Sequence, residues 1–119
     1  MRIGELARRT GVSERSLRYY EEQGLLAPTR SASGYRQFTD EHVTTVRGIR
    51  SLLAAGLSTA IIGELLPCMV DTGAGLAPGC PELVPELERE RDRITAAIDE
   101  LVTARALLEQ VIANTPAAV

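Results

Sequence analysis

Much of the chain repeats apolar residues with the 3.6-residue period of a helix, and glycine, proline and serine interrupt the pattern at intervals. Near the N-terminus, Ile3, Leu6 and Ala7 share one helix face, and Gly11 ends that helix. Ser13 predicts the start of a second helix, ERSLRYYEEQ, because its hydroxyl can accept from the free N–H groups of the next turn. Two short helices joined by the turn TGVS indicate a helix-turn-helix, whose second helix is the candidate reading element.

The helical pattern breaks off after this pair and resumes near residue 39. Pro28 disfavours helix and SASG is typical of a turn, so the flanking segments LLAPTR and YRQF predict a small two-stranded hairpin, or wing. Thr39 then caps a longer helix, DEHVTTVRGIRSLLAAG, and Ser58 caps a shorter one, TAIIGELL, which Pro67 stops. These two helices form a second helix pair.

Residues 67–80, PCMVDTGAGLAPGC, hold three glycines and two prolines and predict an irregular connector. A long helical pattern follows it. The sequence therefore divides into a helical domain over 1–67, the connector over 68–80, a long helix over 81–114 and a tail over 115–119.

The long helix carries an apolar stripe that repeats every seven residues. Two heptad positions make up this stripe. One holds Leu87, Ile94, Leu101 and Leu108, and the other holds Val84, Ile98 and Ile112 together with Arg91 and Arg105. Four consecutive heptads of this kind predict a coiled-coil seam. No later element of the sequence would cover the seam, so we expect a second copy of the chain to do so. The alternative is that the helix folds back on its own N-terminal domain.

Charge separates the two halves of this 119-residue chain. Residues 1–57 carry nine arginines and six acidic residues, a balance of +3, whereas residues 58–119 carry four arginines and ten acidic residues, a balance of −6. The balance suggests an N-terminal part that faces a polyanion, although an excess of three charges can also arise by chance. The N-terminus lacks the pattern of a signal peptide, and no apolar run approaches the roughly 20 residues that span a bilayer. We therefore expect a cytoplasmic protein that does not engage membranes.

The segment MRIGELARRTGVSERSLRYYEEQGLL, followed by SGYRQFT and VRGIRSLLAAGLS, resembles the MerR family of bacterial transcription regulators. This resemblance covers nearly the whole chain. It implies a mostly α fold: a winged helix-turn-helix DNA-binding domain, a second helix pair, and a long coiled-coil helix that pairs antiparallel with its twin. It also implies a homodimer on an imperfect inverted repeat between promoter elements. Such regulators bend and underwind the DNA so that RNA polymerase can use both elements once an effector is bound.

The first half of the reading helix supplies the candidate base and phosphate contacts. Ser13, Glu14, Arg15 and Arg18 lie in the part of such a helix that faces the major groove. Arg15 and Arg18 are three residues apart and share a face, and Arg18 is a good candidate for a phosphate or guanine contact. Glu21 and Glu22 are anionic and are expected on a solvated face or in an intramolecular ion pair.

Aromatic residues are only 3% of the chain, and all four lie between residues 19 and 38. By resemblance, one of the adjacent tyrosines reaches a phosphate, and we assign this contact to Tyr19 and packing to Tyr20. Tyr35 and Arg36 match the phosphate-contacting GYR of the family's wing, although Tyr35 could instead pack within the hairpin. Phe38 is expected in the core.

Cys68 and Cys80 are the only cysteines, and they are the candidate residues for sensing an effector. In metal-sensing relatives a thiolate ligand lies just before the dimerisation helix, where Cys80 stands. The segment NTPAAV supplies none of the further ligands, and we expect neither a four-cysteine iron–sulfur cluster nor a C-terminal effector domain. Three interpretations stay open: two inert residues, a thiol-reactive or redox sensor, and a metal ion on the four thiols of a dimer. No cofactor is expected, with the metal ion as the exception.

Catalysis is not expected. No Ser/His/Asp, Cys/His or paired-carboxylate pattern is present, and the single histidine, His42, falls in a capping turn where a surface or partly packed role is expected. The remaining alternative is an effector-independent architectural factor of the same winged-helix class. The long dimerisation helix argues against it, since such factors are commonly shorter. The effector, the operator and the sign of regulation are not readable from the sequence.

Overall fold

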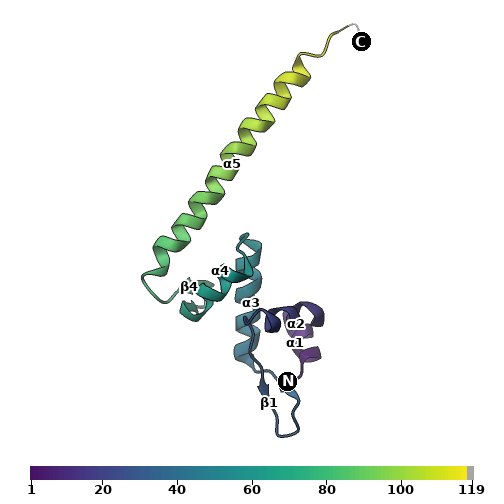
Figure 1. The fold of residues 1–119 in the computed structure, drawn as a ribbon, viewed down its shortest axis with the longest axis vertical. Helices are drawn as coiled ribbons and strands as arrows, with labels where there is room; N and C mark the ends of the chain where they lie inside the picture. Colours follow the sequence, from purple (N-terminus) through teal and green to yellow (C-terminus); the bar gives the residue numbers. More distant parts are fainter. Residues whose placement is uncertain (118–119) are drawn as a thin grey trace. The chain divides into compact units, whose positions relative to one another are not determined.

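A computed structural model describes residues 1–117, and its elements are mostly helical (Figure 1). In chain order they are α1 (Ile3–Thr10), α2 (Glu14–Glu22), β1 (Thr29–Arg30), β2 (Arg36–Gln37), α3 (Asp40–Ala54), α4 (Thr59–Leu65), the 3-10 turn η1 (Leu66–Cys68), β3 (Met69–Asp71), β4 (Leu76–Pro78) and α5 (Leu83–Ala113). Two compact units result, one ending at Cys80 and one beginning at Pro81. Each is described by itself.

The helix-turn-helix forms where the sequence predicts it. Gly11 ends α1 in the left-handed conformation, with φ of 72°, which glycine adopts without steric cost. Ser13 caps α2, since its Oγ accepts from the backbone N–H of Ser16 at 3.1 Å. Both local signals were readable from residue type alone, because each acts within one helical turn.

The wing is a short antiparallel hairpin in which Thr29 pairs with Gln37 and Arg30 with Arg36. The N-terminus runs beside its second strand. The ammonium group of Met1 donates to the carbonyl of Phe38 at 2.7 Å, and the N–H of Phe38 donates to the carbonyl of Met1 at 2.7 Å. The hairpin prediction is confirmed, and the pairing with Met1 is an addition that the sequence did not reveal.

The core of the first unit forms around α3, which packs against α1 and α4. Val43, Val46, Ile49 and Leu52 form the buried face of α3, and Phe38 lies in the core as expected. The largest fully buried side chains are Phe38, Leu6, Leu17, Ile49, Ile62, Leu65 and Val46. Each such side chain contributes about 1.5–3 kcal/mol of transfer free energy when it is buried. These contributions hold the helix-turn-helix to the second helix pair.

His42 links the start of α3 to the segment that leads into the wing. Its Nδ1 accepts from the backbone N–H of Thr39 at 2.8 Å, as in a capping box, and its Nε2 donates to the carbonyl of Ala27 at 2.9 Å. The ring also meets Phe38 edge-on, with 5.4 Å between centroids. The expected partly packed position is confirmed, but these contacts make His42 a structural residue.

We expect His42→Ala to lower the free energy of unfolding by about 2 kcal/mol, because two hydrogen bonds are lost and one of them caps the start of α3. Urea denaturation at one fixed protein concentration measures the change. Thr44→Ala, an exposed substitution on the same helix, serves as the control and should stay within about 0.5 kcal/mol of the wild type. Equal stability of His42→Ala and the wild type would contradict this role.

The prediction of an irregular connector before α5 is wrong. After η1, the strands β3 and β4 form an antiparallel hairpin with Met69 opposite Pro78 and Asp71 opposite Leu76. Gly73 and Gly75 supply the positive φ values of its turn, and Asp71 Oδ1 accepts from the N–H of Gly73. Glycine and proline here build a tight turn and its flanks, so this segment belongs to the first unit and not to a separate linker.

The second unit contains α5, a helix of 31 residues. Figure 1 shows it as one uninterrupted coil. It begins two residues later than the sequence predicts, and Pro85 lies in its first turn, where its missing N–H is tolerated. Of the expected tail, residues 118 and 119 lie outside the described part. No helix within residues 1–117 is long and apolar enough to cross a bilayer.

Candidate nucleic-acid interface and cysteine pair

Helix α2 separates its side chains into a packed face and an exposed face. Leu17 and Tyr20 are buried, whereas Ser13, Glu14, Arg15 and Arg18 are exposed. The packed residues stand three apart, as do Arg15 and Arg18, so each set shares one face of the helix. Within residues 1–117 neither Arg15 nor Arg18 is placed in an ion pair with an acidic side chain.

The adjacent tyrosines of α2 point in different directions. Tyr19 keeps 46% of its surface exposed, whereas Tyr20 keeps only 7%. The prediction that Tyr20 packs is therefore confirmed. Tyr19 has the exposure that a phosphate contact requires, and its contact with DNA stays a prediction.

The wing presents Tyr35 to solvent, with 53% of its surface exposed. The alternative in which the ring packs within the hairpin is therefore wrong. The ring instead receives the guanidinium group of Arg2, whose central carbon lies 4.0 Å from the ring centroid. A cation held over an exposed tyrosine at the tip of a hairpin makes a positively charged surface on the wing.

Arg36 ties the wing to α2 through Glu21. Its Nε lies 3.0 Å from Oε2 of Glu21, so the expected intramolecular ion pair for Glu21 is confirmed. Glu21 stands one turn beyond Arg18 on the same helix face, which brings the wing arginine next to the arginine of the reading helix. Arg36 has five N–H donors, and this pair engages only Nε, so the terminal amino groups can serve an anion.

Arg2 is a member of this surface that the sequence did not reveal. The only local signal is a basic residue before α1. Its place beside the wing depends on the pairing of Met1 with Phe38, which joins residues 37 positions apart. The exposed surface formed by Arg2, Arg15, Arg18, Tyr19, Tyr35 and Arg36 is called the basic face below.

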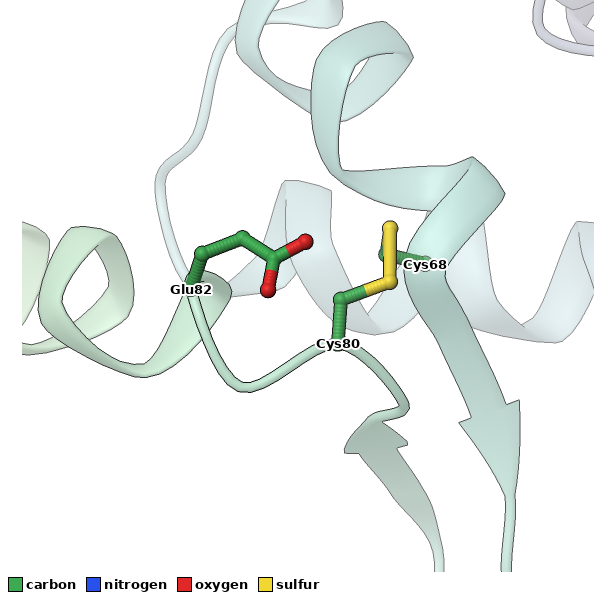
Figure 2. A group of neighbouring side chains, drawn as sticks. All are labelled: Cys68, Cys80 and Glu82. Carbon is green, nitrogen blue, oxygen red and sulfur yellow. A yellow bond between two sulfur atoms is a disulfide. The ribbon is translucent and has the colours of Figure 1, made fainter.

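Cys68 and Cys80 are joined in a disulfide that closes the base of the β3–β4 hairpin (Figure 2). Their Cα atoms lie 5.4 Å apart, and both residues are half-buried. The N–H of Gly79 donates to the carbonyl of Cys68 at 2.6 Å. A Cβ at Gly79 would lie 2.9 Å from Val70 and 3.1 Å from that carbonyl, so only glycine allows this approach.

The bond changes the interpretation of the two cysteines. Neither cysteine is a free thiol in this structure, and whether the bonded pair is inert stays untested. The ligand that a metal needs from cysteine is a thiolate, so the disulfide form does not fit a metal ion. A redox role is compatible with this bond and stays a prediction, as does a metal ion on the reduced pair.

The sequence of most of the first unit matches a known protein family. Residues 1–67 match the MerR HTH family regulatory proteins. The chain is 37% identical over 105 residues to heavy metal-dependent transcription regulator 2 of Rhizobium meliloti strain 1021, a match that covers 85% of this chain and 69% of that protein.

Two solved structures show the same fold. The transcription regulator PbrR691 from Ralstonia metallidurans CH34, in complex with lead(II), has a TM-score of 0.78 at 25% identity, covering 98% of this chain and 89% of that one. HiNmlR, a MerR family regulator lacking the sensor domain and bound to promoter DNA, has a TM-score of 0.61 at 27% identity, covering 94% and 86%.

Proposed function

Because this chain belongs to the MerR family of helix-turn-helix transcription regulators, we propose that it binds a promoter inverted repeat as a homodimer and distorts the DNA to control transcription initiation. It is a DNA-binding transcription regulator and not an enzyme. The observation that carries the proposal is the basic face, which combines the exposed side of α2 with the wing.

Each copy of the chain reads one half of the repeat. Helix α2 enters the major groove, where Arg18 contacts a guanine or a phosphate and Arg15, Ser13 and Glu14 lie at the base edges. Tyr19, Tyr35 and Arg36 contact phosphates on either side of that groove. Phosphate contacts fix the orientation of the protein, and the residues of α2 supply the sequence preference.

A second copy covers the apolar stripe of α5. Within one chain, Ile98, Leu101, Leu108 and Ile112 keep between 53% and 70% of their surface exposed, whereas Leu87 and Ile94 are half-buried. The exposed apolar side chains of Val102, Leu107 and Val111 widen the stripe on both sides near the C-terminal end. An exposed apolar stripe of this kind is typical of a helix in a coiled coil. Two copies of α5 paired antiparallel would bury the stripes of both chains.

Distortion of the DNA is part of the proposal because the two α2 helices of one dimer must reach both half-sites of the repeat. DNA that is bent to meet them changes the spacing of the promoter elements for RNA polymerase. A protein that acts on chromosomal DNA in this way works in the cytoplasm. A metal ion as the effector would require the dithiol form of Cys68 and Cys80, in which thiolates become available.

Selection from a pool of random duplexes tests the proposal. The bound duplexes are expected to share an inverted repeat, and affinity for them should fall steeply as salt rises, since phosphate neutralisation releases counterions. Transcription by RNA polymerase from a promoter that contains the repeat should change when the protein is added. Binding without any change in transcription would favour the architectural alternative, and enrichment of no common sequence would contradict the proposal.

We propose that Arg2, held over Tyr35, also contacts a phosphate. We therefore expect Arg2→Ala to weaken binding to the selected duplex and to lower the magnitude of the salt slope by about 2, because each copy in the dimer loses that contact. Sequence preference should be unchanged, since a phosphate contact does not read bases. Mobility-shift titrations over a series of salt concentrations give both quantities. An unchanged slope would remove Arg2 from the basic face.

A further inference from the structure

We infer that the Cys68–Cys80 pair is a reversible disulfide switch that acts on the DNA-binding unit through the β3–β4 hairpin. The inference rests on the proposed function, because it assumes that the protein acts on DNA inside the cell. It extends that function by assigning the input to a thiol–disulfide exchange within one chain. The chain has no other cysteine, so both redox partners are identified.

The disulfide fixes the base of the hairpin. Cys68 ends η1 immediately before β3, and Cys80 follows β4 after Gly79 alone. The two strands therefore leave and return at one point that is held by the covalent bond and by the hydrogen bond between Gly79 and Cys68. Removal of the covalent bond leaves the hairpin held by non-covalent contacts and gives its chain more conformations in the open state.

The hairpin and η1 rest directly on α3, at a position where α3 has no side chain. Gly48 is buried, and a Cβ at this position would lie 3.4 Å from Cδ1 of Leu76 on β4 and 3.9 Å from Cδ2 of Leu66 on η1. The leucine of the hairpin thus occupies space beside the helix backbone. A shift of the hairpin changes what α3 packs against at its middle.

Helix α3 in turn supports both parts of the basic face. Arg50 donates from its Nη1 to the carbonyl of Thr10 at 2.9 Å, at the end of α1 before the helix-turn-helix turn. At the other end of α3, His42 holds the carbonyl of Ala27 before the wing. One helix therefore joins the disulfide-closed hairpin to the turn that sets α2 and to the segment that sets the wing.

Reversible reduction of this disulfide is compatible with the cytosol, where a bacterial DNA-binding regulator acts. Cytosolic thiols are kept reduced, and a disulfide found there is usually catalytic or redox-sensing. A dithiol reductant attacks one sulfur of the half-buried pair, forms a mixed disulfide and releases the other cysteine as a thiolate. The second thiol of the reductant then resolves it. In total two electrons and two protons pass to the pair, and the reductant becomes a disulfide.

Reoxidation needs a peroxide as the electron acceptor. One cysteine thiolate attacks the peroxide and becomes a sulfenic acid as one water leaves, and the other thiol condenses with it as a second water leaves. The pair thus returns to the disulfide without any further residue of the chain. The two forms differ in mass by two hydrogen atoms, which intact mass spectrometry resolves.

The test compares the disulfide and dithiol forms of the full-length protein on the selected promoter. Each form is prepared with hydrogen peroxide or dithiothreitol and verified by intact mass. We expect the transcript yield of the two forms to differ by about fivefold or more, the lower range of allosteric coupling. The variant C68S/C80S should match the dithiol form and should not respond to either reagent.

Each outcome decides a separate question. Equal transcription from two forms of verified mass overturns the switch, and so does a redox response that persists in C68S/C80S. Failure of both forms to bind any duplex overturns the proposed function itself, and the inference with it. If both the disulfide and the dithiol form bind but give unequal transcription, the result supports the proposed function and the disulfide switch. The comparison of wild-type forms stands without the variant, so it holds even where C68S/C80S fails to fold.

A second variant tests the route through α3. In Gly48→Leu the new side chain takes the space of Leu76, so the transcript yield of the disulfide form should move toward that of the dithiol form. Ser51→Leu, which adds the same side chain at an exposed position of α3, is the control and should leave the redox response intact. An unchanged response in Gly48→Leu would overturn transmission through this contact.

Discussion

Arg18→Ala is expected to weaken binding to the selected inverted repeat by about 30-fold to 10⁴-fold. An arginine contact to guanine or to the DNA backbone at a reading helix contributes about 1–3 kcal/mol, and a homodimer loses it at both half-sites. Arg18 is exposed and, within residues 1–117, pairs with no acidic side chain, so the loss is not offset by a relieved ion pair. Mobility-shift titration at one fixed salt concentration measures the change.

A charge-matched control separates this effect from the loss of positive charge in general. Arg89→Ala removes an exposed arginine of α5 that lies away from the apolar stripe, and we expect it to alter affinity by less than about threefold. Equal losses for the two variants would indicate non-specific electrostatics. An unaffected Arg18→Ala protein would remove α2 as the reading helix.

The double variant L101D/L108D is expected to dissociate the dimer and abolish binding to the full repeat at concentrations where the wild type binds. Both leucines lie on the predicted seam and are largely exposed in one chain, so a partner helix is what would bury them. Four leucines are lost in each dimer, at about 1.5 kcal/mol or more apiece, and four carboxylates would be buried instead. The dimer dissociation constant should therefore rise by more than about 10⁴-fold. Sedimentation velocity gives the oligomeric state.

Its matched control places the same charges on the opposite side of α5. Ala96 and Ala106 are exposed and lie away from the seam, so A96D/A106D carries the same helix-propensity cost without entering the interface. This control should sediment as a dimer and bind the repeat. A monomeric wild type, or a dimeric L101D/L108D protein, would contradict the proposed α5 pairing.

Elements set by residues within one or two helical turns were predictable from the sequence. The cap at Ser13 and the stop at Gly11 follow from local hydrogen bonding and helix periodicity, and the packing of Tyr20 with Tyr19 exposed agrees with what the family resemblance implied. The heptad stripe of α5 is local in the same sense, and its exposure in a single chain agrees with the expectation. Local signals are strong where the side chains that decide a structure are neighbours in the chain.

The β3–β4 hairpin shows where local signals mislead. Three glycines and two prolines between residues 67 and 80 indicate irregular chain, because the same residue types build loops and tight turns alike. What selects the hairpin is the pairing of Met69–Asp71 with Leu76–Pro78, the disulfide at its base and the seat beside Gly48. Each of these contacts joins residues that lie apart in the chain, and amino-acid composition does not show which of them will meet.

The helix-turn-helix, the wing and the outward-facing residues of α2 could be predicted from the sequence, since they depend on spacing along one helix or hairpin, and the family could be predicted from the resemblance of the quoted segments. Only the tertiary structure decided that Arg2 joins Tyr35 on the wing, that Glu21 holds Arg36, and that Cys68 bonds to Cys80. The physical reason is distance along the chain. A contact between remote residues forms when the packing of the core brings them together, and no periodicity or cap records which remote partners will meet.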